Sequence, residues 1–255
     1  MALPNVAART AALAIAAIVL SGPVLAQTLP ATRNVVLVHG AWVDGSSWQK
    51  VYQILTDRGF AVSIVQNPLT SFADDVAATR RVIALQDGPV VLVGHSYGGS
   101  IITEAGTDPK VAALVYIAAF APDVGQSALD QVPKGAPPLP VIPSADGFLF
   151  FDKAMFHAGF AADLTAAQAD FLATAQVPFS LDSFGGKMSV AAWASKPSWH
   201  LIPTEDRAIA PELQQMMAKR AGSTVVTIAG SHAVYISQPE AVADLIEKAA
   251  NGISN

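Results

Sequence analysis

The sequence predicts an α/β protein with a doubly wound, mostly parallel six-stranded sheet, and two observations lead to that prediction. Six short apolar runs rich in β-branched residues recur along the chain; they cover residues 34–38, 61–65, 89–93, 112–117, 199–202 and 224–228. Segments with a helical pattern lie between them; they cover residues 48–58, 72–86, 97–106, 211–221 and 239–251. Continuous apolar strands that alternate with helices are typical of a parallel sheet buried on both faces.

Individual elements carry local signals that agree with this pattern. The first strand run reads Asn-Val-Val-Leu-Val, and no charged side chain interrupts it. The last two helices begin at Pro211 and Pro239, and proline suits the first position of a helix because its missing N–H would have no partner there. Strands followed by helices, repeated in this way, favour right-handed crossovers within one sheet.

Composition excludes several classes of protein. The chain has 255 residues, of which 52% are hydrophobic and 14% charged, so it has enough apolar surface for one large folded domain. Its formal net charge of −5 argues against a nucleic-acid binder held by phosphate contacts. It contains no cysteine, which excludes disulfides, thiolate metal sites and a cysteine nucleophile.

The first 26 residues have the pattern of a secretory signal peptide. Arg9 precedes an apolar run over residues 11–20, and small residues stand before a cleavage site after Ala26. An uncleaved anchor is the alternative, but ten apolar residues are fewer than the roughly 18 that cross a bilayer. We therefore expect a secreted or periplasmic protein, with residues 27–255 forming a single domain and no stable membrane span after cleavage.

One interval interrupts the alternation of strands and helices. Residues 121–197 contain no strong strand, and six prolines fall between Pro122 and Pro143. Amphipathic, helix-like pieces follow at residues 146–156 and 164–175. An insertion of this size is expected to form a cap over the carboxyl edge of the sheet, where open α/β sheets bind their ligands.

The third strand run leads directly into a G-x-S-x-G motif. Residues 94–98 read Gly-His-Ser-Tyr-Gly and stand between a buried strand and a helix. This context is typical of a sharp turn that projects a serine hydroxyl above the sheet, and the helix N-terminus behind it favours developing negative charge. Ser96 is therefore the candidate nucleophile.

A serine hydroxyl needs a base, and the chain offers five histidines. Only His232 follows the last strand, which is where the base of this architecture belongs. His95 precedes the nucleophile and points away from it, His39 is expected to brace a loop, and His200 lies inside a strand.

The acid partner must hold the imidazole and stabilise its charged form. Asp206 follows the fifth strand run and gives the chain order serine, acid, histidine. Glu205 beside it and Asp123 after the fourth strand remain alternatives.

Two backbone N–H groups are expected to form an oxyanion hole. Ala41 follows the first strand and Tyr97 follows the nucleophile, and both strands flank the point where the strand order reverses.

Candidate substrate contacts are Trp42, together with His157 and Trp193 of the expected cap. The sequence shows no paired ligand spacing for a metal.

These motifs resemble those of the α/β-hydrolase superfamily. The resemblance rests on residues 36–42 (VLVHGAW), 94–99 (GHSYGG) and 230–233 (GSHA), and it is strongest toward the compact six-stranded branch of small carboxylesterases, plant methyl-ester hydrolases and hydroxynitrile lyases. It implies a hydrolase without cofactor whose cap lines the substrate pocket. The lyases commonly carry threonine after the first histidine, so Gly40 argues against that activity.

The reaction expected from these residues is hydrolysis of a small, neutral, apolar carboxylic ester. The cap is rich in phenylalanine and has only four basic residues, which disfavours an anionic substrate. The alternatives are a cofactor-free perhydrolase or haloperoxidase-type activity, a hydroxynitrile-lyase-like activity, and a ligand sensor with slow turnover. The sequence leaves acyl preference and oligomeric state open.

Overall fold

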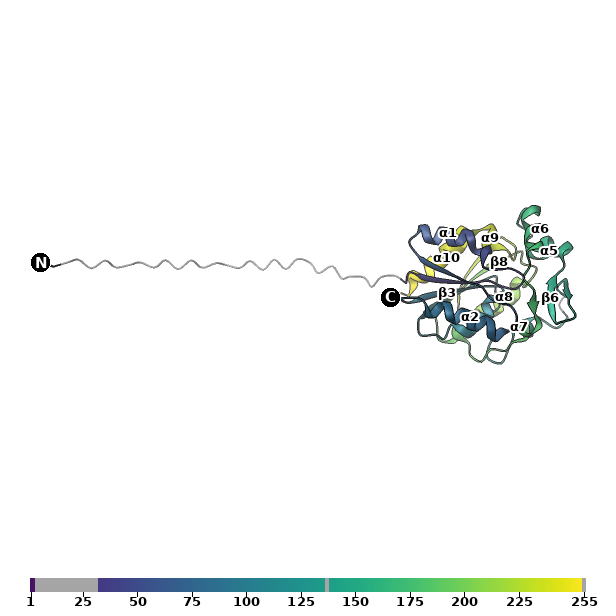
Figure 1. Ribbon diagram of the computed structural model, residues 1–255, viewed down its shortest axis with the longest axis horizontal. Coiled ribbons are helices and arrows are strands. Elements are labelled where there is room, and N and C mark those ends of the chain that lie inside the picture. Colours follow the sequence, from purple (N-terminus) through teal and green to yellow (C-terminus); the bar gives the residue numbers. More distant parts are fainter. Residues whose placement is uncertain (3–31, 136–137, 254–255) are drawn as a thin grey trace.

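The computed structural model describes residues 1–2, 32–135 and 138–253 (Figure 1). The predicted signal peptide, residues 1–26, lies outside the described residues apart from its first two. The rest of the description begins at Thr32, shortly before the first strand.

The centre of the protein is a six-stranded parallel sheet, as the sequence predicts. Its strand order is β2-β1-β3-β4-β8-β9. The strands are β1 (Asn34–Val38), β2 (Ala61–Val65), β3 (Val90–His95), β4 (Val111–Ile117), β8 (Ser198–Pro203) and β9 (Thr224–Ile228). The strand order reverses between β1 and β3, and their register pairs Val38 with Gly94. The loops that follow these two strands therefore leave the sheet side by side.

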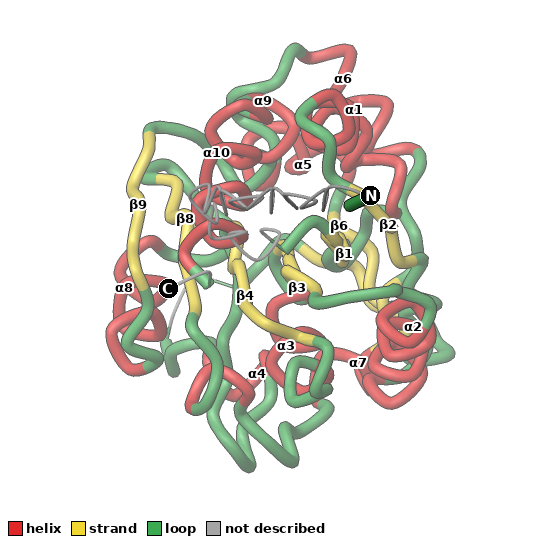
Figure 2. Tube along the Cα trace, turned by 90° about the vertical axis from the view of Figure 1, so that its left-hand side faces the viewer, coloured by secondary structure: helices red, strands yellow, loops and turns green. Residues whose placement is uncertain are grey.

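Successive side chains of the inner strands enter two separate cores. Val35 and Leu37 pack on one face with residues of α1 and α10, whereas Val36 and Val38 pack on the other with residues of α2, α3 and α8. Figure 2 shows α1 and α10 on one side of the strands and α2 and α3 on the other. Burial on both faces explains why the strands read as continuous apolar runs.

The helices of these two layers follow the predicted segments closely. They are α1 (Gln49–Asp57), α2 (Phe72–Ala84), α3 (Gly98–Ala105), α8 (Pro211–Arg220) and α10 (Pro239–Gly252). A 3-10 turn, η1 (Gly45–Trp48), precedes α1, and a short helix, α9 (Val234–Ser237), precedes α10. Ser71 caps α2 by accepting a hydrogen bond from the N–H of Asp74, which satisfies a donor of the first turn.

The cap lies between β4 and β8 and contains more strand than the sequence suggests. It holds α4 (Ala128–Gln131), β5 (Val141–Pro143), β6 (Phe148–Phe151), α5 (Lys153–Phe160), α6 (Ala166–Thr174), β7 (Phe179–Ser180), α7 (Leu181–Gly185) and η2 (Ala192–Ala194). The three strands form a small antiparallel sheet in the order β5-β6-β7. Figure 1 shows β6, α5, α6 and α7 together at the end of the main sheet.

The helical prediction for residues 146–156 is wrong in its first half. Residues 148–151 form β6, with Leu149 and Phe151 buried and the alternate residues half-buried. Aromatic residues favour strands when a partner strand is present, and β5 and β7 provide that partner. The helical pattern is realised only from Lys153 onward, in α5. The second helix-like piece, residues 164–175, is confirmed as α6.

Within the described part of the chain, no helix has the length and apolar character needed to cross a membrane.

His200 is a buried side chain of the main sheet, as its position in a strand predicts. It is 1% exposed, and its ring stacks on Tyr116 with the centroids 4.4 Å apart. Among the described residues, neither ring nitrogen has a hydrogen-bond partner. Burial lowers the pKa of His200 to about 3, so the ring is neutral in the folded protein.

We predict that His200 contributes to loss of stability in acid. The unfolded chain binds a proton at this residue near pH 6.5 and the folded chain only near pH 3, so stability is full above pH 6.5 and falls as the pH drops between these values. Replacing His200 with Phe should reduce the loss of unfolding free energy between pH 7 and pH 4 by about 3 kcal/mol. Urea unfolding at both pH values measures this, and an unchanged pH dependence would contradict the prediction.

Candidate active site

Ser96 occupies a strained turn between β3 and α3. Its φ of 55° lies in the left-handed region, which a non-glycine residue adopts at a cost. Glycines make the turn possible because neighbouring backbone is very close. A Cβ on Gly94 would lie 2.5 Å from the carbonyl oxygen of Gly98, and one on Gly98 would lie 2.7 Å from that of Val38. The spacing of the motif is therefore imposed by packing of β1, β3 and α3.

The structure brings Ser96, His232 and Asp206 into one hydrogen-bonded chain. The Nε2 atom of His232 lies 2.8 Å from Oγ of Ser96, and its Nδ1 lies 2.8 Å from Oδ2 of Asp206. His232 follows β9 and Asp206 follows β8, so each side chain comes from the carboxyl end of a different strand. All three residues are buried, which shields the chain of hydrogen bonds from water.

The carboxylate of Asp206 is fully engaged. Its Oδ1 accepts hydrogen bonds from the N–H groups of Ala208 and Ile209, at 2.8 and 2.9 Å. Its Oδ2 accepts one from Nε2 of Gln214 at 2.8 Å, in addition to the contact with His232. These donors fix the carboxylate in place beside the imidazole.

The two alternative acids lie elsewhere. Glu205 is exposed to solvent. Asp123 accepts a hydrogen bond from the neighbouring N–H of Val124, and no contact joins it to His232. Among the three candidates, only Asp206 meets the imidazole.

The loop after β1 lies directly against the nucleophile. A Cβ on Gly40 would lie 2.7 Å from Cβ of Ser96 and 2.9 Å from the carbonyl oxygen of His95. Within the described residues, the backbone N–H groups of Ala41 and Tyr97 donate no hydrogen bond to the protein. Ala41 and Tyr97 line the same cavity as Ser96, so both N–H groups remain candidates for the predicted oxyanion hole.

Two other histidines hold the site together rather than react. His39 accepts a hydrogen bond at Nε2 from the N–H of Asn67, 2.9 Å away, so it braces a loop. The Nε2 of His95 lies 3.0 Å from the carbonyl oxygen of His232. Burial, with a smaller effect of His232, lowers the pKa of His95 well below 6.5, so the neutral ring donates this bond.

The cap supplies a residue that the sequence analysis missed. Asp163, between α5 and α6, accepts hydrogen bonds from both the N–H and the hydroxyl of Ser231, the residue before His232. The hydroxyl of Ser237 donates to the same carboxylate at 2.7 Å. Burial opposes ionisation of Asp163, but these hydrogen bonds outweigh it and lower its pKa. Only the folded chain brings the loop of Asp163 next to Ser231 and His232, so no local sequence pattern could predict this contact.

The predicted substrate contacts separate into two groups. Trp42 lines the cavity beside Ser96, and its Nε1 donates to the carbonyl oxygen of Leu149 in the cap. His157 lies outside that cavity, with Nε2 3.0 Å from the carbonyl oxygen of Leu164. Trp193 also lies outside it, where it donates to the carbonyl of Pro122. The structure therefore does not bring these two cap residues to the nucleophile, because both face the cap's own backbone.

The cavity at the triad is narrow and apolar. Its volume is about 20 Å³, little more than one water molecule occupies. It is lined by Ala41, Trp42, Ser96, Tyr97, Phe120, Leu139, Phe179, Phe184, Ala208, Ile209 and His232. Apart from Ser96 and His232, this lining carries no ionisable group but the Tyr97 phenol. The cavity, as the structure describes it, is therefore smaller than an ester substrate.

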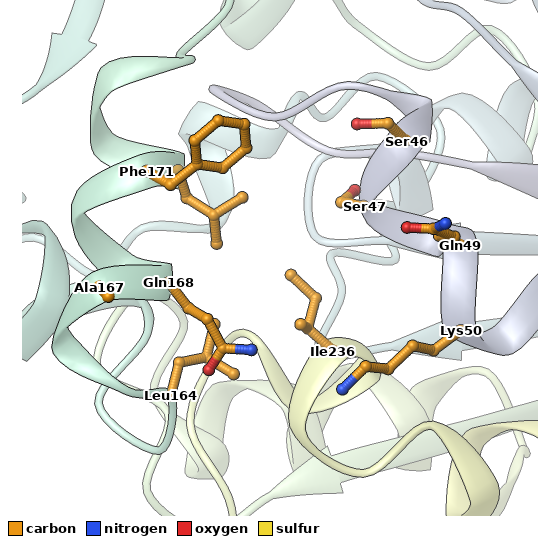
Figure 3. A pocket seen from close by; sticks show the side chains of 10 residues that line it. Ser46, Ser47, Gln49, Lys50, Leu164, Ala167, Gln168, Phe171 and Ile236 are labelled. Atoms are coloured by element: carbon orange, nitrogen blue, oxygen red, sulfur yellow. The ribbon is translucent and has the colours of Figure 1, made fainter.

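A wider groove lies elsewhere, between the cap and α1. Figure 3 shows Phe171 and Gln168 of α6 across from Ser47 and Lys50, with Ile236 of α9 at the base. Its volume is about 570 Å³, and none of the triad residues lines it. Size alone therefore does not locate the chemistry. In the part of the chain that the structure describes, no group of three or more acidic or histidine side chains has the geometry of a metal site.

The sheet, the strained serine and the chain of hydrogen bonds together define an α/β hydrolase. The model of the alpha/beta hydrolase family matches residues 35–245, and the chain belongs to this family.

Curated relatives agree with this assignment. A carbendazim hydrolyzing esterase of Nocardioides sp. (strain SG-4G) is 35% identical over 121 residues, which are 41% of this chain and 49% of the relative, so the match spans about half of that protein. The alpha/beta hydrolase nvfD of Aspergillus novofumigatus is 27% identical over 72% of this chain and 80% of its own length. Putative methylesterase 11 of Arabidopsis thaliana is 25% identical over 84% of this chain and 63% of its own length.

Solved structures share the fold. A pyrethroid hydrolase from Sphingobium faniae JZ-2 superposes with a TM-score of 0.73 at 23% identity, over 86% of this chain and 97% of that one. An extracellular alpha/beta-hydrolase from a Paenibacillus species has a TM-score of 0.72 at 23% identity, over 85% and 98% of the two chains. At this identity the likeness establishes the architecture alone.

We predict that Asp206 and not Glu205 supports the base. Asp206→Asn leaves the shape of the side chain but removes the charge that orients His232, so kcat should fall by about 10⁴. Glu205→Gln should stay within about a factor of two of wild type, because Glu205 contacts no reacting group. Steady-state kinetics on a chromogenic ester measures both, and the opposite ranking would move the acid to Glu205.

Proposed function

We propose that the protein is a carboxylic ester hydrolase that acts through an acyl-enzyme on Ser96. The single observation that carries the proposal is the buried chain of hydrogen bonds from Asp206 through His232 to Ser96, with 2.8 Å at each step. This arrangement takes the proton from a serine hydroxyl as it attacks a carbonyl carbon. The family assignment and the names of the relatives, esterase and methylesterase, support the same chemistry.

In the first half of the proposed reaction, Oγ of Ser96 attacks the ester carbonyl and Nε2 of His232 receives its proton. The carbonyl oxygen becomes negative and accepts hydrogen bonds from the N–H groups of Ala41 and Tyr97. His232 then gives the proton to the leaving alcohol, and the carbon–oxygen bond of the ester breaks. The acyl group remains on Ser96.

The second half repeats these steps with water. His232 removes a proton from water as its oxygen attacks the acyl carbon, and the same proton returns to Oγ of Ser96 when the acid leaves. Asp206 stabilises the imidazolium in both halves. Its engaged carboxylate keeps the ring in the tautomer with a proton on Nδ1, which leaves Nε2 free to act as base.

The lining of the cavity supports a small, neutral, apolar substrate. Its walls include Trp42, Phe120, Phe179 and Phe184, and among the described residues that line it there is no lysine or arginine to neutralise a substrate carboxylate. Placing an unpaired charge in such a site is costly. One relative is named for hydrolysis of carbendazim, a small molecule, which is in keeping with this proposal.

A lyase activity on the same triad is disfavoured by the space at Gly40. A side chain there would meet Cβ of Ser96 at 2.7 Å, so the threonine expected of a hydroxynitrile lyase does not fit without a shift of backbone.

We also propose that the enzyme acts outside the cytoplasm, on the strength of the leader pattern in residues 1–26.

The mechanism is tested by covalent labelling together with kinetics. A fluorophosphonate should add to Oγ of Ser96 with loss of fluoride, and mass spectrometry of peptides locates the adduct. Ser96→Ala should lose the adduct and lower kcat by about 10⁴ or more while the protein remains folded. An adduct on another residue, or retained activity in Ser96→Ala, would refute the proposal.

Substrate class is tested with matched esters. We expect kcat/KM for a neutral p-nitrophenyl butyrate to exceed that for the p-nitrophenyl monoester of succinate by about tenfold or more, because the anionic acyl group finds no cation in the cavity. Equal values for the two esters would show that the acyl site lies outside the cavity described above.

A further inference from the structure

Asp75 is a buried carboxylate that the triad does not use. It lies in the first turn of α2 and is 0% exposed. Its Oδ2 accepts hydrogen bonds from the phenol of Tyr97 at 2.8 Å and the hydroxyl of Ser183 at 3.1 Å. Its Oδ1 accepts one from the N–H of Leu69 at 2.7 Å. Burying a carboxylate costs free energy that its three donors, from three separate segments, must offset. Such an arrangement suggests a function for the residues that donate to it.

The first partner belongs to the proposed oxyanion hole. Tyr97 follows the nucleophile, and its own backbone N–H is one of the two proposed donors. Its phenol is 1% exposed, and burial together with Asp75 raises the Tyr97 pKa well above 10, so the phenol remains a proton donor. Asp75 therefore binds the side chain of the residue whose backbone N–H is a proposed oxyanion donor.

The second partner belongs to the cap. Ser183 lies in α7, and Ser180 caps that helix through the N–H of Ser183 at 2.9 Å. The N–H of Ser180 also donates to the carbonyl oxygen of Leu69 at 3.0 Å. The cap thus meets the α2 region at two adjacent points, the carboxylate of Asp75 and the backbone of Leu69.

Local geometry shows that this contact is tightly built. Leu69 has a φ of 56°, a strained conformation that surrounding contacts must hold. Gly186, at the end of α7, lies so close to α2 that a Cβ there would be 2.2 Å from Cβ of Phe72. Glycine is required at this position for α7 to reach Asp75.

We propose that Asp75 is a positioning residue that couples docking of cap helix α7 to alignment of the Tyr97 N–H in the oxyanion hole. The inference rests on the proposed function of Ser96. Because the closed cavity holds about 20 Å³, the cap must leave to admit substrate, and Ser183 then leaves Asp75. Return of the cap restores the shared hydrogen bonds and fixes the Tyr97 phenol before the oxyanion forms.

Because Asp75 can be protonated, the proposed coupling should depend on pH. Burial, with a smaller effect of Asp74 on the same helix, outweighs the hydrogen bonds from Tyr97, Leu69 and Ser183 and raises the Asp75 pKa to about 6. The other groups that face it are the Tyr97 phenol from the elbow, the uncharged Ser183 from α7 and the backbone of Leu69. Below pH 6 the protonated carboxyl must itself donate a hydrogen bond, so it accepts less well from Tyr97 and Ser183.

The first test is the kinetics of Asp75→Asn beside a matched control. Asparagine keeps the shape but has one acceptor oxygen for three donors, so kcat should fall about tenfold or more with KM within about twofold. Asp74→Asn, an exposed neighbour on the same turn, should match wild type. The ratio of wild-type to Asp75→Asn kcat should be constant above pH 7 and fall toward one below pH 6. All other groups are the same in the two proteins, so pH effects that do not involve Asp75 cancel in this ratio.

A second pair of variants keeps the test valid if Asp75→Asn does not fold. Tyr97→Phe removes the phenol, and Ser183→Ala removes the cap contact. If both residues act through Asp75, the loss of kcat in the double variant should be smaller than the product of the fold-losses measured in the two single variants. Thermal unfolding of each variant accompanies the kinetics, so that a loss of kcat is distinguished from a loss of folded protein.

Three results would overturn the inference: an unchanged kcat in Asp75→Asn, a kcat ratio that does not vary between pH 5 and pH 8, or independent effects of Tyr97→Phe and Ser183→Ala. Its failure can be distinguished from failure of the proposed function. If wild-type protein does not cleave esters through Ser96, the proposed function fails. If it does so and the Asp75 variants behave like wild type, the coupling alone is wrong.

Discussion

The site depends on one strained backbone conformation, the left-handed φ of 55° at Ser96. The conformation persists because β1, β3 and α3 pack so closely that Gly94 and Gly98 have no room for a side chain. The same close packing places the loop of Gly40 against the serine. The positions of Ser96 and of the loop that carries Ala41 therefore depend on close contact between neighbouring parallel strands, and packing of the sheet holds Ser96 in its strained conformation.

The cap is attached to this core by polar contacts at the strand ends rather than by apolar packing alone. Trp42 donates to Leu149, Asp163 holds the loop that carries the base, and Asp75 accepts from Ser183. The first two contacts join the loops after β1 and β9 to the cap, and the third joins helix α2 to it. These contacts hold the cap over the small, buried cavity beside Ser96, and low exposure to water strengthens the electrostatic interactions among Ser96, His232 and Asp206.

The strands and the long helices could be predicted because their signal is local. Strands buried on both faces must be apolar throughout, and helices covering them must begin and end with suitable residues. Residues 148–151 were predicted wrongly because their conformation depends on β5 and β7, which are distant partners. His157 and Trp193 were placed at the substrate from chain position alone, yet both donate to carbonyl groups of the cap.

The sequence by itself determined the order and type of the elements, the turn that carries Ser96 and the candidate base His232. These features follow from the spacing of residues along the chain, which does not depend on how the chain folds. Only the tertiary structure selected Asp206 over Glu205 and Asp123, closed the cavity and assembled Asp75 with its donors. Those outcomes depend on distances between segments far apart in the chain, and such distances are fixed by packing of the whole core rather than by any local pattern.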